Sequence, residues 1–258
     1  MEKETGGAVL VDAHDGILTI TLNRPEKRNA VNRAVAEGVS AALDRLEEDD
    51  ALRVGVITGA GGTFCAGLDL DAFTHGEVAR SATRGFAGIV ERPPTKPLIA
   101  AVEGWALGGG FEILLCCDLL VASSTAVLGL PEVKRGLVAR GGGALRLLHH
   151  LPRSRALELL LTGDPITAED AHAYGLVNRL AEPGQTLRVA QDLARTISAN
   201  APMAVSAAKQ IIAEAPRWQP DEAFRRQGEI LAPVFDSADA REGALAFKEK
   251  RVPVWQGR

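Results

Sequence analysis

The chain has 258 residues, of which 46% are hydrophobic and 24% charged, and its formal net charge is −4. This composition is typical of a folded globular protein rather than a disordered chain, and the length suits one large core with or without a smaller appended unit. The negative net charge provides no general attraction to nucleic acid or anionic lipid, and no apolar run reaches the ~18 residues of a spanning helix, so we expect neither nucleic acid nor a membrane as a partner.

The cysteines and the first residues bear on the compartment. Three cysteines cannot all pair with one another, and Cys116 and Cys117 are neighbours in an apolar run, which favours buried, reduced thiols. The segment from Met1 to Thr5 is acidic and lacks the apolar stretch of a secretory signal. We therefore expect a cytoplasmic protein.

The first half of the chain alternates between strand and helix patterns. Period-two alternation in 8–14 and 17–22, on either side of Asp15-Gly16, predicts a β-hairpin. Apolar residues at helical spacing predict a helix over 32–49, which precedes a short strand over 54–58. Further strands are expected at 98–102 and 119–122, with an apolar, glycine-led helix over 108–117 between them.

From about residue 142 onward, helical patterns dominate. They cover 153–161, 184–200, 202–213 and 221–234. Strands that alternate with helices, followed by helices alone, predict an α/β core with a helical extension. We expect the core and the candidate site over 1–195, and a helical C-terminal region over 196–258.

Common motifs for metal and dinucleotide chemistry are absent from the sequence. The two glycine clusters have Phe64 and Ile113 where the third glycine of a dinucleotide fingerprint belongs. His149 and His150 are neighbours, so they do not share one face of a helix or strand. We therefore expect no bound metal.

Two segments, 61–70 and 104–112, each lead from a strand through a glycine-rich turn into a helix start. The first N–H groups of a helix lack an intrahelical acceptor and lie at the positive end of its dipole, and glycine lets a ligand approach them closely. Two such N–H groups that converge would form an oxyanion hole. The alternative interpretation is a pair of ordinary tight turns between strand and helix.

Two carboxylates lie in apolar surroundings near these turns. Glu112 follows the triple glycine, and Glu132 follows Pro131. A buried, unpaired carboxylate is costly, so such a residue often has a chemical role, although either acid could simply complement a helix N-terminus. Together with the two turns, the acids suit proton transfer beside a stabilised enolate.

At these motifs the chain resembles the crotonase (enoyl-CoA hydratase/isomerase) superfamily over essentially its whole length, from Leu22 to Arg251. The motifs that carry the resemblance are Ala66-Gly67-Leu68-Asp69-Leu70, Leu107-Gly108-Gly109-Gly110-Phe111-Glu112 with Cys117-Asp118, and Gly129-Leu130-Pro131-Glu132. The resemblance implies an α/β fold, a crotonase-like spiral of strand-strand-helix turns with a helical C-terminal trimerisation region. It also implies a homotrimer or a dimer of trimers that acts on an acyl-CoA substrate.

By position, the resemblance assigns roles to the residues of both turns. The backbone N–H groups of Leu68 and Gly109 match the family's oxyanion hole. Glu112 matches the glutamate that orients and activates water, and Glu132 matches the one that exchanges the proton at C2. Retention of both glutamates favours hydration of 2-enoyl-CoA thioesters to 3-hydroxyacyl-CoA over double-bond migration, because isomerases of the superfamily commonly keep only one.

The family's coenzyme A site matches this chain at six positions: Lys27, Arg28, Ala66, Leu70, Phe247 and Lys250. In many members the last two positions reach the 3′-phosphate and adenine from a neighbouring subunit. For the three basic residues, a merely solvated charge is the alternative. Because coenzyme A enters as part of the substrate, the resemblance implies no separate cofactor.

Arg140 departs from the family pattern, because it stands where many hydratases have a glycine close to the catalytic water. Its guanidinium could point outward, bind a phosphate of coenzyme A or lower the pKa of Glu132. The segment 132–138 also resembles members that handle other acyl groups, including carnitinyl-type dehydratases. The alternatives to a hydratase are therefore an isomerase, a carnitinyl-CoA-type dehydratase and a catalytically silent acyl-CoA-binding regulator.

Overall fold

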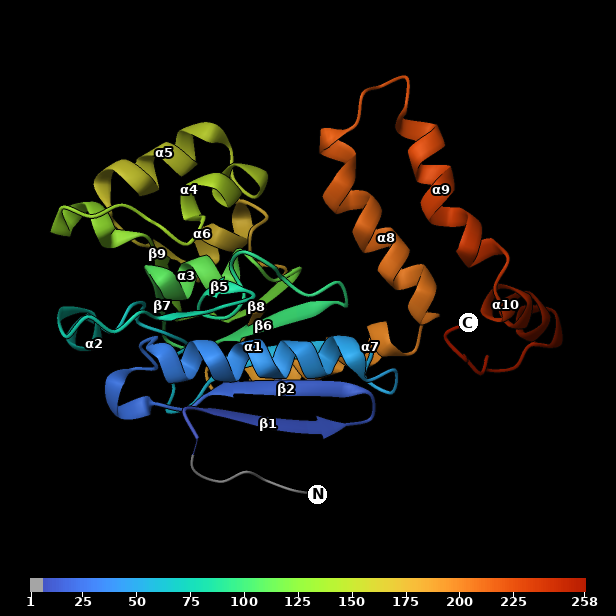
Figure 1. Ribbon diagram of the computed structural model, residues 1–258, viewed down its shortest axis with the longest axis horizontal. Helices are drawn as coiled ribbons and strands as arrows, with labels where there is room; N and C mark the ends of the chain where they lie inside the picture. Colours follow the sequence, from blue (N-terminus) through green and yellow to red (C-terminus); the bar gives the residue numbers. More distant parts are fainter. Residues whose placement is uncertain (1–6) are drawn as a thin grey trace.

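A computed structural model describes residues 7–258 of the chain (Figure 1). The segment from Met1 to Thr5, used above for the expected compartment, lies outside these residues. Within the described range, every helix is too short or too polar to cross a lipid bilayer.

A six-stranded sheet forms the centre of the molecule, in the order β1-β2-β3-β6-β8-β11. Its strands are β1 (Val9–His14), β2 (Ile17–Leu22), β3 (Val54–Gly59), β6 (Leu98–Val102), β8 (Leu119–Ser123) and β11 (Arg179–Ala181). The first two strands are antiparallel, as the hairpin prediction requires, and the others pair in parallel. Asp15 and Gly16 join the hairpin with positive φ angles, the conformation that a tight two-residue turn needs.

Alternate residues of the central strands pack into two separate cores. Leu98, Ala100 and Val102 of β6 join the larger core, which also contains the apolar face of α1 (Arg33–Glu48). Ile99 and Ala101 face the other way and pack with α7 (Thr186–Ser198). Because a strand directs successive side chains to opposite faces, a buried parallel strand needs helices on both sides.

Smaller elements on one side of this sheet carry the candidate site. A second sheet has the order β10-β9-β7, and a two-stranded ribbon pairs β4 with β5. Their bounds are β4 (Arg80–Ser81), β5 (Gly85–Phe86), β7 (Trp105–Leu107), β9 (Val127–Gly129) and β10 (Ile166–Thr167). The surrounding helices are α2 (Leu70–Thr74), α3 (Gly109–Leu114), α4 (Gly143–Arg146), α5 (Arg153–Thr162) and α6 (Ala168–Ala173). Single 3-10 turns are η1 (Pro25–Lys27), η2 (Pro131–Arg135) and η3 (Leu147–His149).

Three C-terminal helices extend away from the core (Figure 1). They are α8 (Pro202–Glu214), α9 (Ala223–Phe235) and α10 (Ala238–Glu249), with the turn η4 (Ala215–Arg217) after α8. The helix α9 buries none of its residues in the single chain, and exposed apolar side chains such as Phe224 and Phe235 lie on it. The expected division after residue 195 falls inside α7, which packs on the sheet.

The structure differs from the predicted elements mainly around the site. The helix expected over 108–117 ends at Leu114, because the chain must turn at Asp118 to enter β8 beside β6. There Asp118 N–H donates to Leu98 O, and Leu98 N–H donates to the Asp118 carboxylate. The strands β7 and β9 and the helix α10 were not among the predicted elements.

Candidate active site

The two glycine-rich turns converge because Cys65, in the first of them, pairs with β7, the strand that leads into the second. Cys65 N–H donates to Trp105 O at 2.9 Å, and Leu107 N–H donates to Cys65 O at 3.0 Å. A Cβ atom placed on Gly109 would lie 3.6 Å from the backbone nitrogen of Leu68, and one placed on Gly67 would lie 3.1 Å from the nitrogen of Gly109. Neither the Leu68 nor the Gly109 amide donates to an acceptor within residues 7–258. The two amides are thus neighbours with free donors, which is the arrangement an oxyanion hole requires.

Glycine is needed in these turns for conformation and for close packing. Gly67 has φ +99° and Gly108 has φ +54°, where side chains are disfavoured. A Cβ on Gly110 would lie only 2.2 Å from Cys65 O. The glycines therefore let α3 start directly against the segment that carries Leu68.

Glu112 lies in the first turn of α3 and is 3% exposed. Its Oε1 accepts a 2.9 Å hydrogen bond from Gly143 N–H. A Cβ on Gly141 would lie 2.6 Å from its Oε2, so the 141–143 loop packs closely around the carboxyl group. The pKa of Glu112 is raised to about 7, chiefly by burial and in smaller part by the charge of Glu132, against the opposing effect of the backbone N–H groups of Gly143 and Gly141.

Glu132 lies in η2, next to the Gly108 turn. A Cβ on Gly108 would lie 3.3 Å from Glu132 Oε1, while Oε2 is buried and has no hydrogen-bond partner within the described residues. Burial raises the pKa of Glu132, although its own backbone N–H and Arg135 oppose the shift. An orphaned buried carboxyl oxygen beside the amide turn is poised to hold a substrate or water atom.

Phe86 and Arg146 also belong to this site, and sequence analysis missed both. The Phe86 ring packs on the turn and the loop: a Cβ on Gly109 would lie 2.5 Å from its Cζ, and one on Gly141 would lie 3.2 Å from its Cδ1. Arg146 donates to Gly141 O and Val90 O, and its charge lowers the pKa of Glu112. Phe86 comes from the stretch 70–95, where no periodicity indicated its position.

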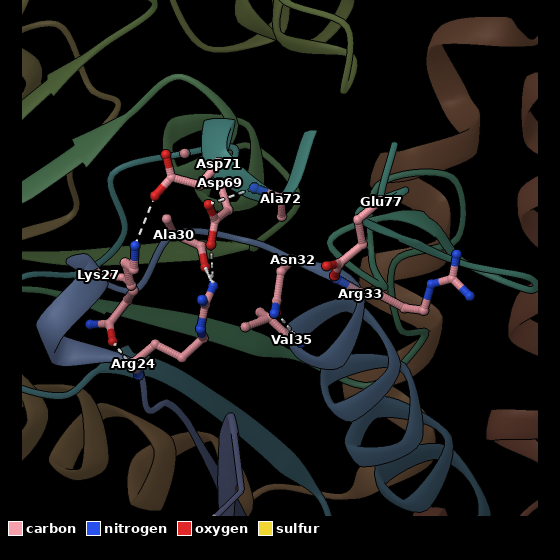
Figure 2. A network of polar contacts seen from close by, with 12 residues as sticks. Arg24, Lys27, Ala30, Asn32, Arg33, Val35, Asp69, Asp71, Ala72 and Glu77 are labelled. Carbon is pink, nitrogen blue, oxygen red and sulfur yellow. Dashed lines mark hydrogen bonds and ion pairs between the residues drawn. The ribbon is translucent and has the colours of Figure 1, made fainter. Parts of the chain in front are cut away.

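Four of the six residues expected at coenzyme A lie together beside the turns. Arg28 stacks on Trp105, with 5.1 Å between guanidinium carbon and ring centroid, and its carbonyl accepts from Ala66 N–H. Lys27 pairs with Asp71 at 2.8 Å (Figure 2), and this ion pair raises the pKa of Lys27. Leu70 is half-exposed at the start of α2.

The other two residues are not brought to this site within one chain. Phe247 is 88% exposed on α10, and Lys250 is exposed directly after it. In Figure 1, α10 and α2 lie at opposite ends of the molecule. Within one chain, these two residues therefore lie away from the four residues beside the turns.

Arg140 is exposed and forms no ion pair with any residue in 7–258. Of the three possibilities for its guanidinium, this position agrees with the outward one. The close approach to Glu112 is made instead by the glycines that follow it, Gly141 and Gly143.

The thiols and acids elsewhere form no further reactive centre in the described part of the chain. Cys65, Cys116 and Cys117 are buried and free, as expected, and burial raises the pKa of both Cys65 and Cys116 to about 12. No cluster of His, Cys, Asp and Glu among residues 7–258 has the arrangement of a metal site.

Comparison with known proteins identifies the family. The model of the enoyl-CoA hydratase/isomerase family matches residues 12–258. Enoyl-CoA hydratase EchA19 of Mycobacterium tuberculosis is 42% identical, over 99% of this chain and 98% of its own length. A carnitinyl-CoA dehydratase of Escherichia coli K12 is also 42% identical, over 94% and 95% of the two chains.

Comparison with a solved structure supports the same family and identifies the fold. The crystal structure of enoyl-CoA hydratase EchA1 from Mycobacterium marinum superposes with a TM-score of 0.96 at 55% identity, covering 98% of this chain and all of that one. The crotonase-like α/β fold expected from the motifs is therefore confirmed. This chain belongs to the enoyl-CoA hydratase/isomerase family of the crotonase superfamily.

Proposed function

We propose that this protein hydrates 2-enoyl-CoA thioesters reversibly to 3-hydroxyacyl-CoA, in fatty-acid or related acyl-CoA metabolism. The observation that carries the proposal concerns two acids beside the free amides of Leu68 and Gly109. The carboxyl group of Glu112 is buried, and that of Glu132 is partly buried, with its Oε2 unpaired within the described residues. Each part of the reaction has a group with the required chemistry at this place.

The amides would receive the thioester oxygen and bear the negative charge of the enolate. Water adds its oxygen to C3 and gives a proton to the Glu112 carboxylate, while the electron pair of the double bond moves toward the carbonyl. Glu132 delivers a proton to C2, which its raised pKa favours because the acid form persists to higher pH. A proton transfer from Glu112 to Glu132 then restores the carboxylate of Glu112 and the protonated form of Glu132.

Water and the substrate supply every atom in this reaction, so it needs no metal and no redox cofactor, and coenzyme A enters as part of the substrate. Lys27, Arg28, Ala66 and Leu70 would bind coenzyme A from the same chain. Phe247 and Lys250 would reach its 3′-phosphate and adenine from a neighbouring subunit, in a homotrimer or a dimer of trimers. The exposed apolar side chains of α9 support such an assembly, and the free, buried thiols support a cytoplasmic location.

Dehydration of carnitinyl-CoA is the second candidate, because a relative that is 42% identical bears that name. It would use the same two acids in the reverse direction, with elimination of water across C2 and C3. The two candidate functions share their catalytic groups, so only the preferred acyl group distinguishes them.

A substrate panel tests the proposal. Purified protein is assayed with 2-enoyl-CoA esters of increasing chain length, a 3-enoyl-CoA and carnitinyl-CoA, by the absorbance of the enoyl thioester. We expect the highest kcat/KM with a 2-enoyl-CoA. A preference for the 3-enoyl ester would make the protein an isomerase, a preference for carnitinyl-CoA would make it a dehydratase of that kind, and tight binding without turnover would make it a silent binding protein.

A further inference from the structure

Leu68 lies in a short extended segment that is held along one edge. Val31 N–H donates to Gly67 O at 2.7 Å, and Asp69 N–H donates to Val31 O at 3.0 Å. Because successive peptide groups of an extended chain point to opposite edges, the N–H of Leu68 points away from Val31. That direction is toward Gly109, whose backbone forms the other half of the amide pair.

The Asp69 carboxylate is the side chain that holds the end of this segment. It is buried, and its Oδ1 accepts from Ala72 N–H at 3.2 Å, which caps the N-terminus of α2. Its Oδ2 pairs with the Arg24 guanidinium at 2.9 Å. Burial by itself would raise the pKa of Asp69, but the Ala72 N–H and Arg24 outweigh it and hold the pKa below its usual value, so the group stays ionised.

Arg24 connects the Asp69 carboxylate to the segment of Ala30 and Val31, which pairs with the segment of Leu68 (Figure 2). The same guanidinium nitrogen, Nη1, that pairs with Asp69 also donates to Ala30 O at 2.7 Å, one residue before Val31. Arg24 is itself fixed by a 2.8 Å hydrogen bond from its own N–H to Asn29 Oδ1. This largely buried ion pair therefore connects the segment of Ala30 and Val31 with the segment of Leu68 and Asp69.

We propose that Arg24 and Asp69 are positioning residues for the oxyanion hole, which hold the Leu68 amide in the direction that the thioester oxygen requires. The inference rests on the proposed function and adds two residues to it that do not touch the substrate. Small displacements of a donor weaken stabilisation of the transition state far more than they weaken binding of the ground state. Loss of the ion pair should therefore lower kcat and leave KM nearly unchanged.

The chain offers a matched control on the same two segments. Lys27 and Asp71 form an exposed ion pair between η1 and α2, near the Arg24–Asp69 pair in Figure 2. Asp71→Asn removes this exposed pair without altering Asp69, Arg24 or the ladder at Val31. Because exposed ion pairs contribute little to stability, this variant should retain the fold and kcat. Its KM also reports the freed Lys27, which the proposed function places at coenzyme A.

The test compares Asp69→Asn, Arg24→Gln and Asp71→Asn by kcat, KM and the red shift of bound 2,4-hexadienoyl-CoA, whose absorbance reports polarisation of the thioester carbonyl. We expect Asp69→Asn and Arg24→Gln to lower kcat about 10- to 100-fold, to change KM less than about threefold and to reduce the red shift. Asp71→Asn should match the wild type in kcat and in the red shift. Thermal unfolding establishes whether each variant is folded. If Arg24→Gln does not fold, Arg24→Lys, which keeps the positive charge, replaces it.

Three results would decide against the assignment or against its premise. A folded Asp69→Asn variant with an unchanged red shift and kcat would overturn the positioning role. A loss confined to KM would assign the pair to binding of coenzyme A instead. Wild-type protein that binds the dienoyl thioester without any red shift would overturn the proposed function itself, independently of Arg24 and Asp69.

Discussion

Gly143 donates its backbone N–H to Oε1 of Glu112 at 2.9 Å, although the two residues are far apart in the sequence. This contact orients a carboxyl group whose other oxygen lies against Gly141. A side chain at either glycine would meet the carboxyl group, so the loop is shaped to hold an acid rather than merely to connect elements. Several properties of the protein should follow from this buried acid and from the amides beside it.

Replacement of Glu112 by Gln should lower kcat about 10³-fold while KM changes only a few-fold, because the amide keeps the shape but does not accept a proton from water. In the wild type, kcat/KM should fall below a pH of about 7, as protonation removes the base form of Glu112. Steady-state kinetics across pH checks both points. Glu182→Gln, at an exposed acid, is the control, and near-wild-type turnover of Glu112→Gln would disprove the assigned role.

The same variant should be more stable than the wild type at high pH. The pKa of Glu112 is about 7 in the folded chain and 4.5 in the reference state, so between these values the folded protein binds more protons than the unfolded chain. The contribution of this group to stability is therefore present below about pH 4.5 and is lost as the pH rises through about 7. Glu112→Gln does not ionise, so it should exceed the wild type by up to about 3 kcal/mol at pH 8 and match it at pH 4. Urea unfolding at both pH values checks this, and an equal difference at pH 4 and pH 8 would contradict it.

Substitution of Gly109 by Ala should reduce kcat about 10²- to 10³-fold, because the new Cβ would lie 2.5 Å from Phe86 Cζ and would displace the amide turn. Truncation of the ring in the double variant Gly109→Ala/Phe86→Ala removes this collision and should restore part of the activity. Phe86→Ala alone serves as the reference. A double variant as inactive as Gly109→Ala would show that the collision with Phe86 is not the cause.

Arg140→Gly should leave kcat within about twofold of the wild type, because this exposed side chain contacts neither acid and surface substitutions usually have small effects. Measurement of kcat and KM over a range of salt concentrations checks this. A rise in kcat would mean that the guanidinium obstructs the catalytic water, whereas a rise in KM at low salt would assign it to a phosphate of coenzyme A.

The three cysteines should not react with iodoacetamide in the native protein at pH 8. They are buried, and the raised pKa of their thiols keeps them protonated, whereas alkylation requires an exposed thiolate. Mass spectrometry before and after denaturation checks this, with three added groups expected only in denaturant. Rapid labelling of the native protein would show that one of the thiols is accessible.

Much of the fold can be read from local patterns in the sequence. The hairpin around Asp15-Gly16 and the amphipathic helix α1 depend on turn chemistry and on periodicity, which neighbouring residues specify by themselves. The strands β7 and β9 have only three residues each, too few for a period to be visible, and they form because distant segments supply their hydrogen-bond partners. The helix α3 stops early for a similar reason, since β6 and β8 must lie side by side.

The candidate site divides in the same way. Glycine-led turns and acids in apolar runs are local features, so the sequence by itself indicated the family. Through that resemblance it predicted both glutamates and the two amides as site residues. Only the tertiary structure decided that Phe86 packs on Gly109, that Gly143 holds Glu112 and that Arg24 pairs with Asp69. These contacts join residues far apart in the chain, and their distances depend on how the strands and loops pack, which no short stretch of sequence specifies.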